Sequence, residues 1–147
     1  MKRLTLLIAL FTISLAAAAQ KGMDIYPLFE GKGKWQHKFN AVHIEGSSLK
    51  QYRLTLFRSI TTSDYRLYEE IENIIEKEGN NAIDKECGYI NGKMYYGFYQ
   101  FRPEDNRYRY IFYRNSSLRD DEPEEATIVY MEGYPTLEEL KKMFQKQ

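Results

Sequence analysis

Aromatic and arginine side chains concentrate in the middle of this chain, where they offer the chemistry of a binding surface. Ten of the 21 Tyr and Phe residues lie between Tyr89 and Tyr113. Tyr and Arg are enriched at the energetic centres of protein interfaces, because a rigid apolar body there carries a polar tip. We therefore predict a binding surface on two neighbouring strands, made of Tyr95, Tyr99, Tyr108, Tyr110, Arg107 and Arg109.

The alternation of side chains along a strand limits this surface to one face. Successive residues of a strand point to opposite sides of the sheet, so one aromatic face of the hairpin is expected in the core and the other at the surface. The residues leave open which face is which. A platform for a protein or glycan partner is one interpretation. Cross-strand aromatic pairs that only stabilise a solvent-facing sheet are the other.

Residues suited to catalysis or metal binding lack the spacing that such sites need. His43 and Glu45 share a strand face, but a metal site needs three or more convergent ligands. The acidic run from Asp120 to Glu125 lacks the alternation and glycine of a calcium loop. No Gly-x-Ser-x-Gly or His-Glu-x-x-His pattern occurs, and the serines lack an activating neighbour. We expect no catalytic residue, metal or cofactor, with a hydrolase of scattered site residues as an alternative.

Charge and cysteine content narrow the class of protein. The 21 Lys and Arg residues balance 21 Asp and Glu residues, which argues against a nucleic-acid binder because such proteins need a basic excess. The only cysteine, Cys87, has no intrachain partner, so the fold must rest on its apolar core. A buried, inert thiol and a reactive or intermolecular thiol are both consistent with this single residue.

The first 19 residues have the pattern of an export signal. Lys2 and Arg3 precede an apolar run from Leu4 to Leu15, and small residues follow up to Ala19. The apolar run is shorter than the roughly 20 residues that a membrane-spanning helix usually needs. We predict a signal peptide at residues 1–19, a single domain at residues 20–147 with no transmembrane segment, and a periplasmic or secreted location.

Hydrophobic periodicity predicts the first elements of this domain. Residues 24–30 suggest a short helix, and residues 41–45 and 52–62 suggest strands, with Leu54, Leu56 and Ile60 on one face. Apolar residues repeat with helical spacing from Leu67 to Ile75, which predicts an amphipathic helix ending near residue 78. Gly79 then occupies the position of a left-handed helix cap.

The remaining elements follow from turn and capping signals. Asn91-Gly92 predicts a type I′ hairpin leading into a strand at residues 93–102, and further strands are expected at residues 108–115 and 126–132. Thr136 and Glu139 form a capping box at the start of a last helix. This order predicts an α+β fold, with a mostly antiparallel sheet of about five to six strands and two longer helices packed on one face.

Four stretches resemble one group of proteins. They are the signal ending in Ala19-Gln20, residues 54–59, residues 95–101 and residues 130–140. The group consists of small exported proteins of Gram-negative anaerobes, classified only as domains of unknown function. The resemblance implies export and a single-domain architecture, and it implies no activity and no site residues.

These features together predict an exported, non-enzymatic binding or envelope-associated module. It would act through the Tyr/Arg-rich sheet face on a protein or glycan partner at the cell envelope. The alternative from the same residues is a structural homo-oligomer that buries this face against a second copy, so the oligomeric state stays open.

Overall fold

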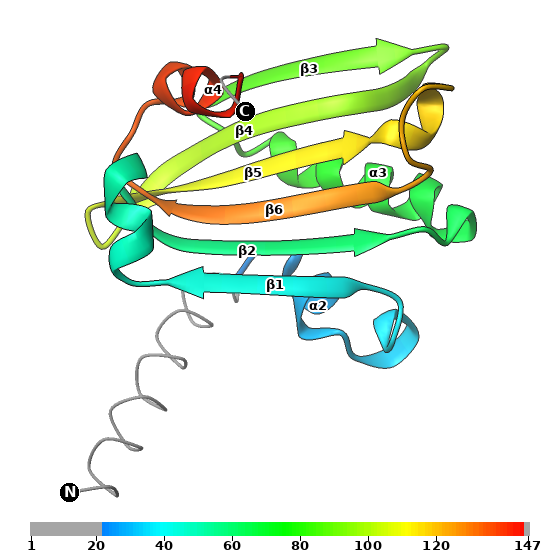
Figure 1. Cartoon of the computed structure of the whole chain (residues 1–147), viewed down its shortest axis with the longest axis horizontal. Helices are drawn as coiled ribbons and strands as arrows, with labels where there is room; N and C mark the ends of the chain where they lie inside the picture. Colours follow the sequence, from blue (N-terminus) through cyan, green and yellow to red (C-terminus); the bar gives the residue numbers. More distant parts are fainter. Residues whose placement is uncertain (1–21, 146–147) are drawn as a thin grey trace, which may run out of the picture.

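A six-stranded antiparallel sheet forms the framework of residues 22–145, which are the residues that the computed structural model describes. Its strands lie in the order β1-β2-β6-β5-β4-β3 (Figure 1). The α+β fold class and the mostly antiparallel sheet are thereby confirmed. The predicted signal peptide lies outside the described residues. None of the helices between residues 22 and 145 is long and apolar enough to cross a membrane.

The elements follow one another closely along the chain. The strands are β1 (Asn40–Glu45), β2 (Leu54–Thr62), β3 (Asp84–Ile90), β4 (Lys93–Glu104), β5 (Arg107–Asn115) and β6 (Ala126–Gly133). The α-helices are α2 (Tyr26–Glu30), α3 (Tyr68–Gly79) and α4 (Leu137–Gln145). Short 3-10 turns join them at η1 (Gly33–Trp35), η2 (Ser47–Tyr52), η3 (Tyr65–Leu67) and η4 (Ser116–Leu118).

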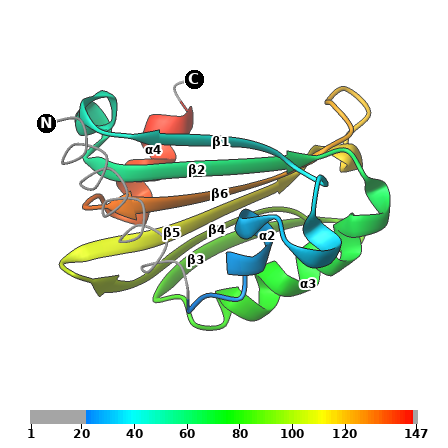
Figure 2. The ribbon, with the colours of Figure 1, turned by 90° about the horizontal axis from the view of Figure 1, so that it is seen from below.

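The two longer helices lie on opposite faces of the sheet, which corrects the prediction that both pack on one face. Ile71 and Ile75 of α3 belong to a buried cluster that also contains residues of α2. Leu137 and Leu140 of α4 belong to a second buried cluster. Figure 1 shows α4 in front of the sheet and α3 behind it, and Figure 2 shows α2 and α3 together. We call these two sides the α3 face and the α4 face.

Aromatic residues on both sides of the strands explain this arrangement. Tyr99 and Tyr130 are buried on the α3 face, whereas Phe98 and Tyr110 are buried on the α4 face. Large rings on both faces need apolar cover on both faces. A sheet with helices on one side only would leave one of these two sets in water.

A register shift in β2 overturns the prediction that Leu54, Leu56 and Ile60 share one face. The pairing of β2 with β6 shifts between Leu54 and Leu56. An extra residue at such a bulge reverses the alternation of side chains. Leu54 therefore packs on the α4 face, while Leu56 and Ile60 pack on the α3 face.

Local turn and capping predictions are confirmed. Asn91 and Gly92 have φ angles of 50° and 79°, the positive values that a type I′ turn requires. The Thr136 hydroxyl accepts a hydrogen bond from the Glu139 backbone N–H at 3.1 Å. The Glu139 carboxylate in turn accepts the Thr136 N–H at 3.2 Å, which completes the capping box.

The role of Gly79 differs from the left-handed cap that its sequence position suggests. It is the last residue of the helix, and its φ is not among the positive values of the described glycines. The ring of Tyr99 lies directly against it, inside the space that a side chain on Gly79 would fill. A Cβ on Gly97 would lie 2.7 Å from the other edge of the same ring. The Tyr99 ring is thus accommodated between two glycines.

Candidate functional site

The fold divides the six predicted binding residues between core and surface. Tyr99 is 2% exposed on the α3 face, and Tyr110 is 0% exposed on the α4 face. Neither side chain is accessible to a partner, because each face of the sheet is covered where these rings lie. The assignment of Tyr99 and Tyr110 to a binding surface is therefore corrected: both residues belong to the core.

The two arginines of the predicted surface lie on the face opposite Tyr108. Arg107 and Arg109 alternate with Tyr108 along β5, so they point to the α3 face. The Arg107 Nη1 atom lies 4.0 Å from a carboxylate oxygen of Glu132, and the Arg109 Nη1 atom lies 3.5 Å from Glu104. The predicted residues therefore do not form one continuous surface.

Tyr95 lies on the α4 face within a network of its own. Its hydroxyl donates to a Glu122 carboxylate oxygen at 2.7 Å and accepts from the Arg114 guanidinium at 2.6 Å. The Arg119 guanidinium lies 4.5 Å from the centre of the Tyr95 ring, on the geometry of a cation–π contact. Tyr95 is thus engaged by its own chain, and Tyr108 packs against the buried cluster of the α4 face.

Two buried carboxyls lie on the α3 face. Glu132 is 3% exposed, and Tyr130 donates a hydrogen bond to it at 2.7 Å. Glu78 is 5% exposed and accepts the Ile25 N–H at 3.2 Å. Burial raises the pKa of both carboxyls, although these hydrogen bonds and nearby arginines oppose the rise.

These raised pKa values predict how stability changes with pH. Above the ordinary carboxyl pKa, the folded protein binds more protons at Glu78 and Glu132 than the unfolded chain does. Their contribution to the free energy of unfolding therefore falls as the pH rises through their folded-state pKa values. We expect Glu78→Gln and Glu132→Gln to lose less stability than the wild type between about pH 5 and pH 7.

Urea unfolding at both pH values measures this difference. Subtracting the wild-type change removes the contributions of Asp64, Glu122 and Glu139, whose hydrogen bonds lower their pKa values. Glu138→Gln, which changes a carboxylate whose side chain is 70% exposed, is the matched control. A pH dependence identical to that of the wild type in both buried variants would contradict the prediction.

Glu78 also lines a polar cavity of about 520 Å³, together with Asn80 and Arg109. The hydrolase alternative requires a polar pocket with a shifted carboxyl or histidine. This cavity supplies the carboxyl, but its lining contains no histidine, serine or cysteine. It therefore meets only part of that requirement.

Cys87 and the acidic residues were the other candidates for chemistry. Cys87 is half-buried and unpaired, and its Sγ atom lies 3.3 Å from the Tyr99 hydroxyl. Across residues 22–145, no three His, Cys, Asp or Glu side chains converge as a metal site. His43 pairs with Glu45 at 2.6 Å.

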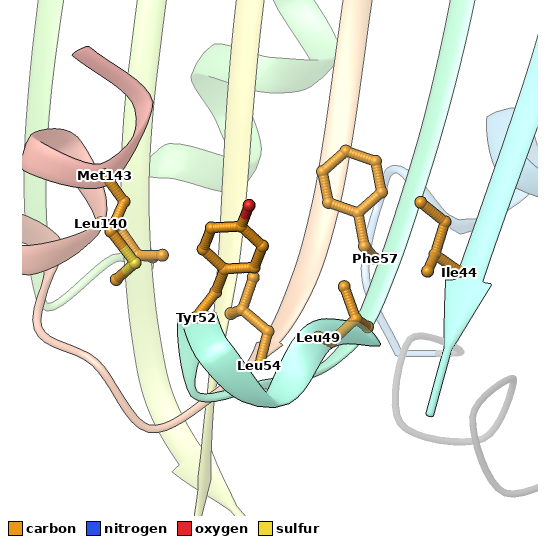
Figure 3. Close-up of a pocket in the computed structure, with 7 residues that line it drawn as sticks. All are labelled: Ile44, Leu49, Tyr52, Leu54, Phe57, Leu140 and Met143. Carbon is orange, nitrogen blue, oxygen red and sulfur yellow. The ribbon is translucent and has the colours of Figure 1, made fainter. Parts of the chain in front are cut away.

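An apolar cleft opens on the α4 face between α4 and η2 (Figure 3). Its volume is about 170 Å³. The Tyr52 hydroxyl is the single polar side-chain group in its lining. The lining residues are Ile44, Leu49, Tyr52, Leu54, Phe57, Leu140 and Met143.

Backbone turns at both ends of η2 create this cleft. Gly46, with a φ of 93°, ends β1, and Arg53, with a φ of 58°, ends η2 in the left-handed conformation. The chain between them folds over the sheet and presents Leu49 and Tyr52 to the cleft. The Arg53 guanidinium donates to the Glu139 carboxylate at 2.9 Å, which joins the two walls.

The size and lining of the cleft indicate what it accepts. Small-molecule and cofactor sites usually enclose about 300–1,000 Å³. A smaller, apolar cleft suits one or two apolar side chains, and its lining offers no carboxylate, imidazole, amine or thiol. The anchor pockets of protein interfaces have this character.

The edge strand β1 borders this cleft. Within the described residues β1 pairs only with β2, and all six of its residues are exposed. Val42 and Ile44 are 54% and 37% exposed on the α4 face. β1 has no lysine, no proline and no register shift, which are usual protections of a sheet edge, and its one acidic residue, Glu45, is its last.

The opposite edge of the sheet is protected. β3 begins with the charged residues Asp84, Lys85 and Glu86, and its pairing shifts between Gly88 and Tyr89. Both features oppose pairing with another strand. The contrast makes β1 the edge that is open to a partner strand.

The apolar cleft was not predicted from the sequence because its lining residues come from four separate elements. The one local signal was the alternation of the apolar residues Val42 and Ile44 along a short strand. That signal identifies a site only when β1 is known to be an edge strand beside η2.

Comparison with known proteins gives one match. The model of a family of unknown function (DUF6108) matches residues 12–144, which is most of the chain. This match confirms the expected resemblance to a domain of unknown function. No curated protein and no solved structure matches the chain.

Proposed function

The chain belongs to this family of unknown function (DUF6108), and we propose that it is a non-enzymatic binding module for an extended, apolar segment of another protein. The N-terminal signal pattern supports action after export, in the periplasm or outside the cell. The partner would be a protein of the cell envelope.

One observation carries the proposal: the open strand edge and the apolar cleft meet at Ile44. This residue belongs to β1 and also lines the cleft. An extended segment added beside β1 would gain main-chain hydrogen bonds from the free edge. Alternate side chains of that segment would point to the α4 face, where the cleft receives an apolar one.

The proposed binding surface therefore replaces the predicted one. Its centre is formed by Val42, Ile44, Tyr52 and Phe57, with the Ile44 and Phe57 positions directly opposite in the β1–β2 pairing. Of the residues predicted for binding, Tyr95, Tyr108 and Tyr110 lie on the same face of the sheet. Tyr110 is buried, and the Tyr95 hydroxyl is bonded to Glu122 and Arg114.

A second copy of the chain is the competing occupant. Because β1 is an edge strand, it is also able to pair with β1 of another copy. The structural homo-oligomer predicted from the aromatic residues would then use this edge. The experiment below separates the two occupants.

We expect Ile44→Lys to weaken peptide binding by about tenfold, because the lysine ammonium would have to lose water against an apolar segment. The probe is a fluorescent nine-residue peptide of alternating valine and threonine, titrated by anisotropy. Ile83→Lys is the matched control. It makes the same exchange at an isoleucine that is 50% exposed and lies outside β1 and the apolar cleft.

The outcomes separate the alternatives. Tighter binding by the wild type and by Ile83→Lys than by Ile44→Lys supports the proposal, with sedimentation showing a monomer. Equal affinity in all three proteins, or no binding by the wild type, contradicts it. A wild-type dimer that Ile44→Lys dissociates would support the homo-oligomer in its place.

A further inference from the structure

A second cavity lies at the end of the sheet opposite the apolar cleft. Its volume is about 730 Å³. It is bordered by the segment that begins α3, by the turn between β3 and β4, and by the segment around η4. In Figure 1 these segments meet on the right, whereas η2 and α4 lie on the left. This volume falls within the range of sites for small molecules.

Two tyrosines from the start of the α3 segment supply aromatic surface to this cavity. Tyr65 is 77% exposed, and Tyr68 is half-buried. The Tyr68 hydroxyl donates to the backbone oxygen of Glu124 at 3.2 Å, which holds its ring in place. An exposed tyrosine ring offers a flat apolar face beside a polar tip.

The polar groups of the cavity include both donors and acceptors. Glu69 and Glu72 supply carboxylates, and Lys93 supplies an ammonium group. The Glu72 carboxylate accepts the Met94 backbone N–H, which fixes its orientation. Ser63 and Ser117 add hydroxyl groups to the lining.

Asn115 supplies a positioned amide. It is 4% exposed, and its side-chain oxygen accepts hydrogen bonds from the Ser117 N–H at 3.1 Å and from the Ser117 hydroxyl at 2.5 Å. Since the oxygen is occupied, the amide NH2 is the group left to donate.

An unsatisfied hydroxyl lies beneath these residues. Tyr113 is 0% exposed, and its hydroxyl makes no hydrogen bond to any residue of the described chain. Burial raises the pKa of Tyr113, and Glu72, Asn115 and Tyr68 are among the neighbours that act on it. All three neighbours line the cavity. Tyr113 itself is not part of the lining, so these three residues connect the cavity to a polar group in the core.

The mixture of groups selects the class of ligand. An anion would meet the acidic residues Glu69, Glu72 and Glu124, and a cation would meet the Lys93 ammonium group. A neutral polyhydroxyl compound uses donors and acceptors together, and it can place its apolar ring face on Tyr65. We propose that this cavity binds a neutral saccharide, at a site separate from the peptide surface around β1.

The test uses the purified protein labelled with 15N and three neutral disaccharides, namely maltose, cellobiose and N,N′-diacetylchitobiose. We expect at least one of them to shift the backbone amide signals of Gly92, Lys93 and Ser117. Tyr65→Ala is expected to weaken that binding at least tenfold. Tyr89→Ala is the control, because Tyr89 is also an exposed tyrosine, 53% accessible, and does not line this cavity.

The proposal fails if none of the three sugars shifts these signals, or if Tyr65→Ala binds the sugar as tightly as the wild type does. Shifts of the same signals by the diamine putrescine, without any response to the sugars, would assign the cavity to a cation. An unchanged spectrum elsewhere shows that Tyr65→Ala is folded, and the outcome is independent of peptide binding at β1.

Discussion

Replacing Tyr110 with alanine is expected to lower the free energy of unfolding by about 3–5 kcal/mol. Tyr110 is 0% exposed and belongs to the buried cluster of the α4 face, with Leu137 and Leu140. Its hydroxyl donates to the backbone oxygen of Pro135 at 2.5 Å, which ties β5 to the turn before α4. The alanine variant would lose both the packed ring and this connection. Urea unfolding followed by circular dichroism measures the loss.

Tyr108→Ala is the matched control for this prediction. Tyr108 lies two residues earlier on the same strand and face, but it is only half-buried. We therefore expect a clearly smaller loss of stability. Equal losses in the two variants would mean that the α4 face is not a packed core at Tyr110. The comparison also tests the correction of the binding surface, since a surface tyrosine would tolerate alanine.

Gly79→Ala is expected to destabilise the protein by about 1–3 kcal/mol, although helix propensity alone predicts a gain of about 1 kcal/mol. A methyl group at this position would overlap the Tyr99 ring. Movement of that ring is opposed because Gly97 lies on its other side and its hydroxyl is 3.6 Å from the Met94 sulfur. The sign of the stability change therefore distinguishes packing from propensity.

Two further variants support the interpretation of that measurement. Asn80→Ala changes the next residue, which is exposed, and is expected to change stability by less than about 0.5 kcal/mol. Combining Gly79→Ala with Tyr99→Leu should cost less than the sum of the two single changes, since leucine vacates the space of the ring. A stabilising Gly79→Ala, or strictly additive losses, would show that the Tyr99 ring does not constrain this position.

Features that depend on neighbouring residues were predicted correctly from the sequence. Asn91-Gly92 specifies its turn through the φ angles those residues tolerate, and Thr136 and Glu139 specify the helix start through their own hydrogen bonds. Helical spacing likewise placed Ile71 and Ile75 on the buried stripe of α3. Each signal lies within a few residues of the structure that it predicts.

The errors concern interactions between distant segments. Leu54 changed faces because β2 shifts its register against β6, which is distant in sequence. Gly79 was assigned a cap because its contact with Tyr99 of β4 leaves no local pattern. The prediction that both helices share one face failed because apolar stripes on α3 and α4 show only that each helix needs a partner surface.

The candidate site likewise combines features that neighbouring residues specify with features that depend on distant segments. Strand alternation establishes that Tyr108 and Tyr110 share a face, but the position of α4 decides that Tyr110 is core and Tyr108 is not. The cleft depends still more on tertiary structure, because Ile44, Tyr52 and Leu140 meet only when η2 and α4 lie over the same end of the sheet.

The α+β class, the order of strands and helices and the main turns could be predicted from the amino-acid sequence, because these follow from short-range backbone preferences and hydrophobic spacing. Long-range packing sets which strand is an open edge, which aromatic rings are buried, and where the apolar cleft and the cavity lined by Tyr65 and Tyr68 form. These features form when apolar surfaces from distant parts of the chain are buried against one another. No single segment of the sequence shows which surfaces will meet.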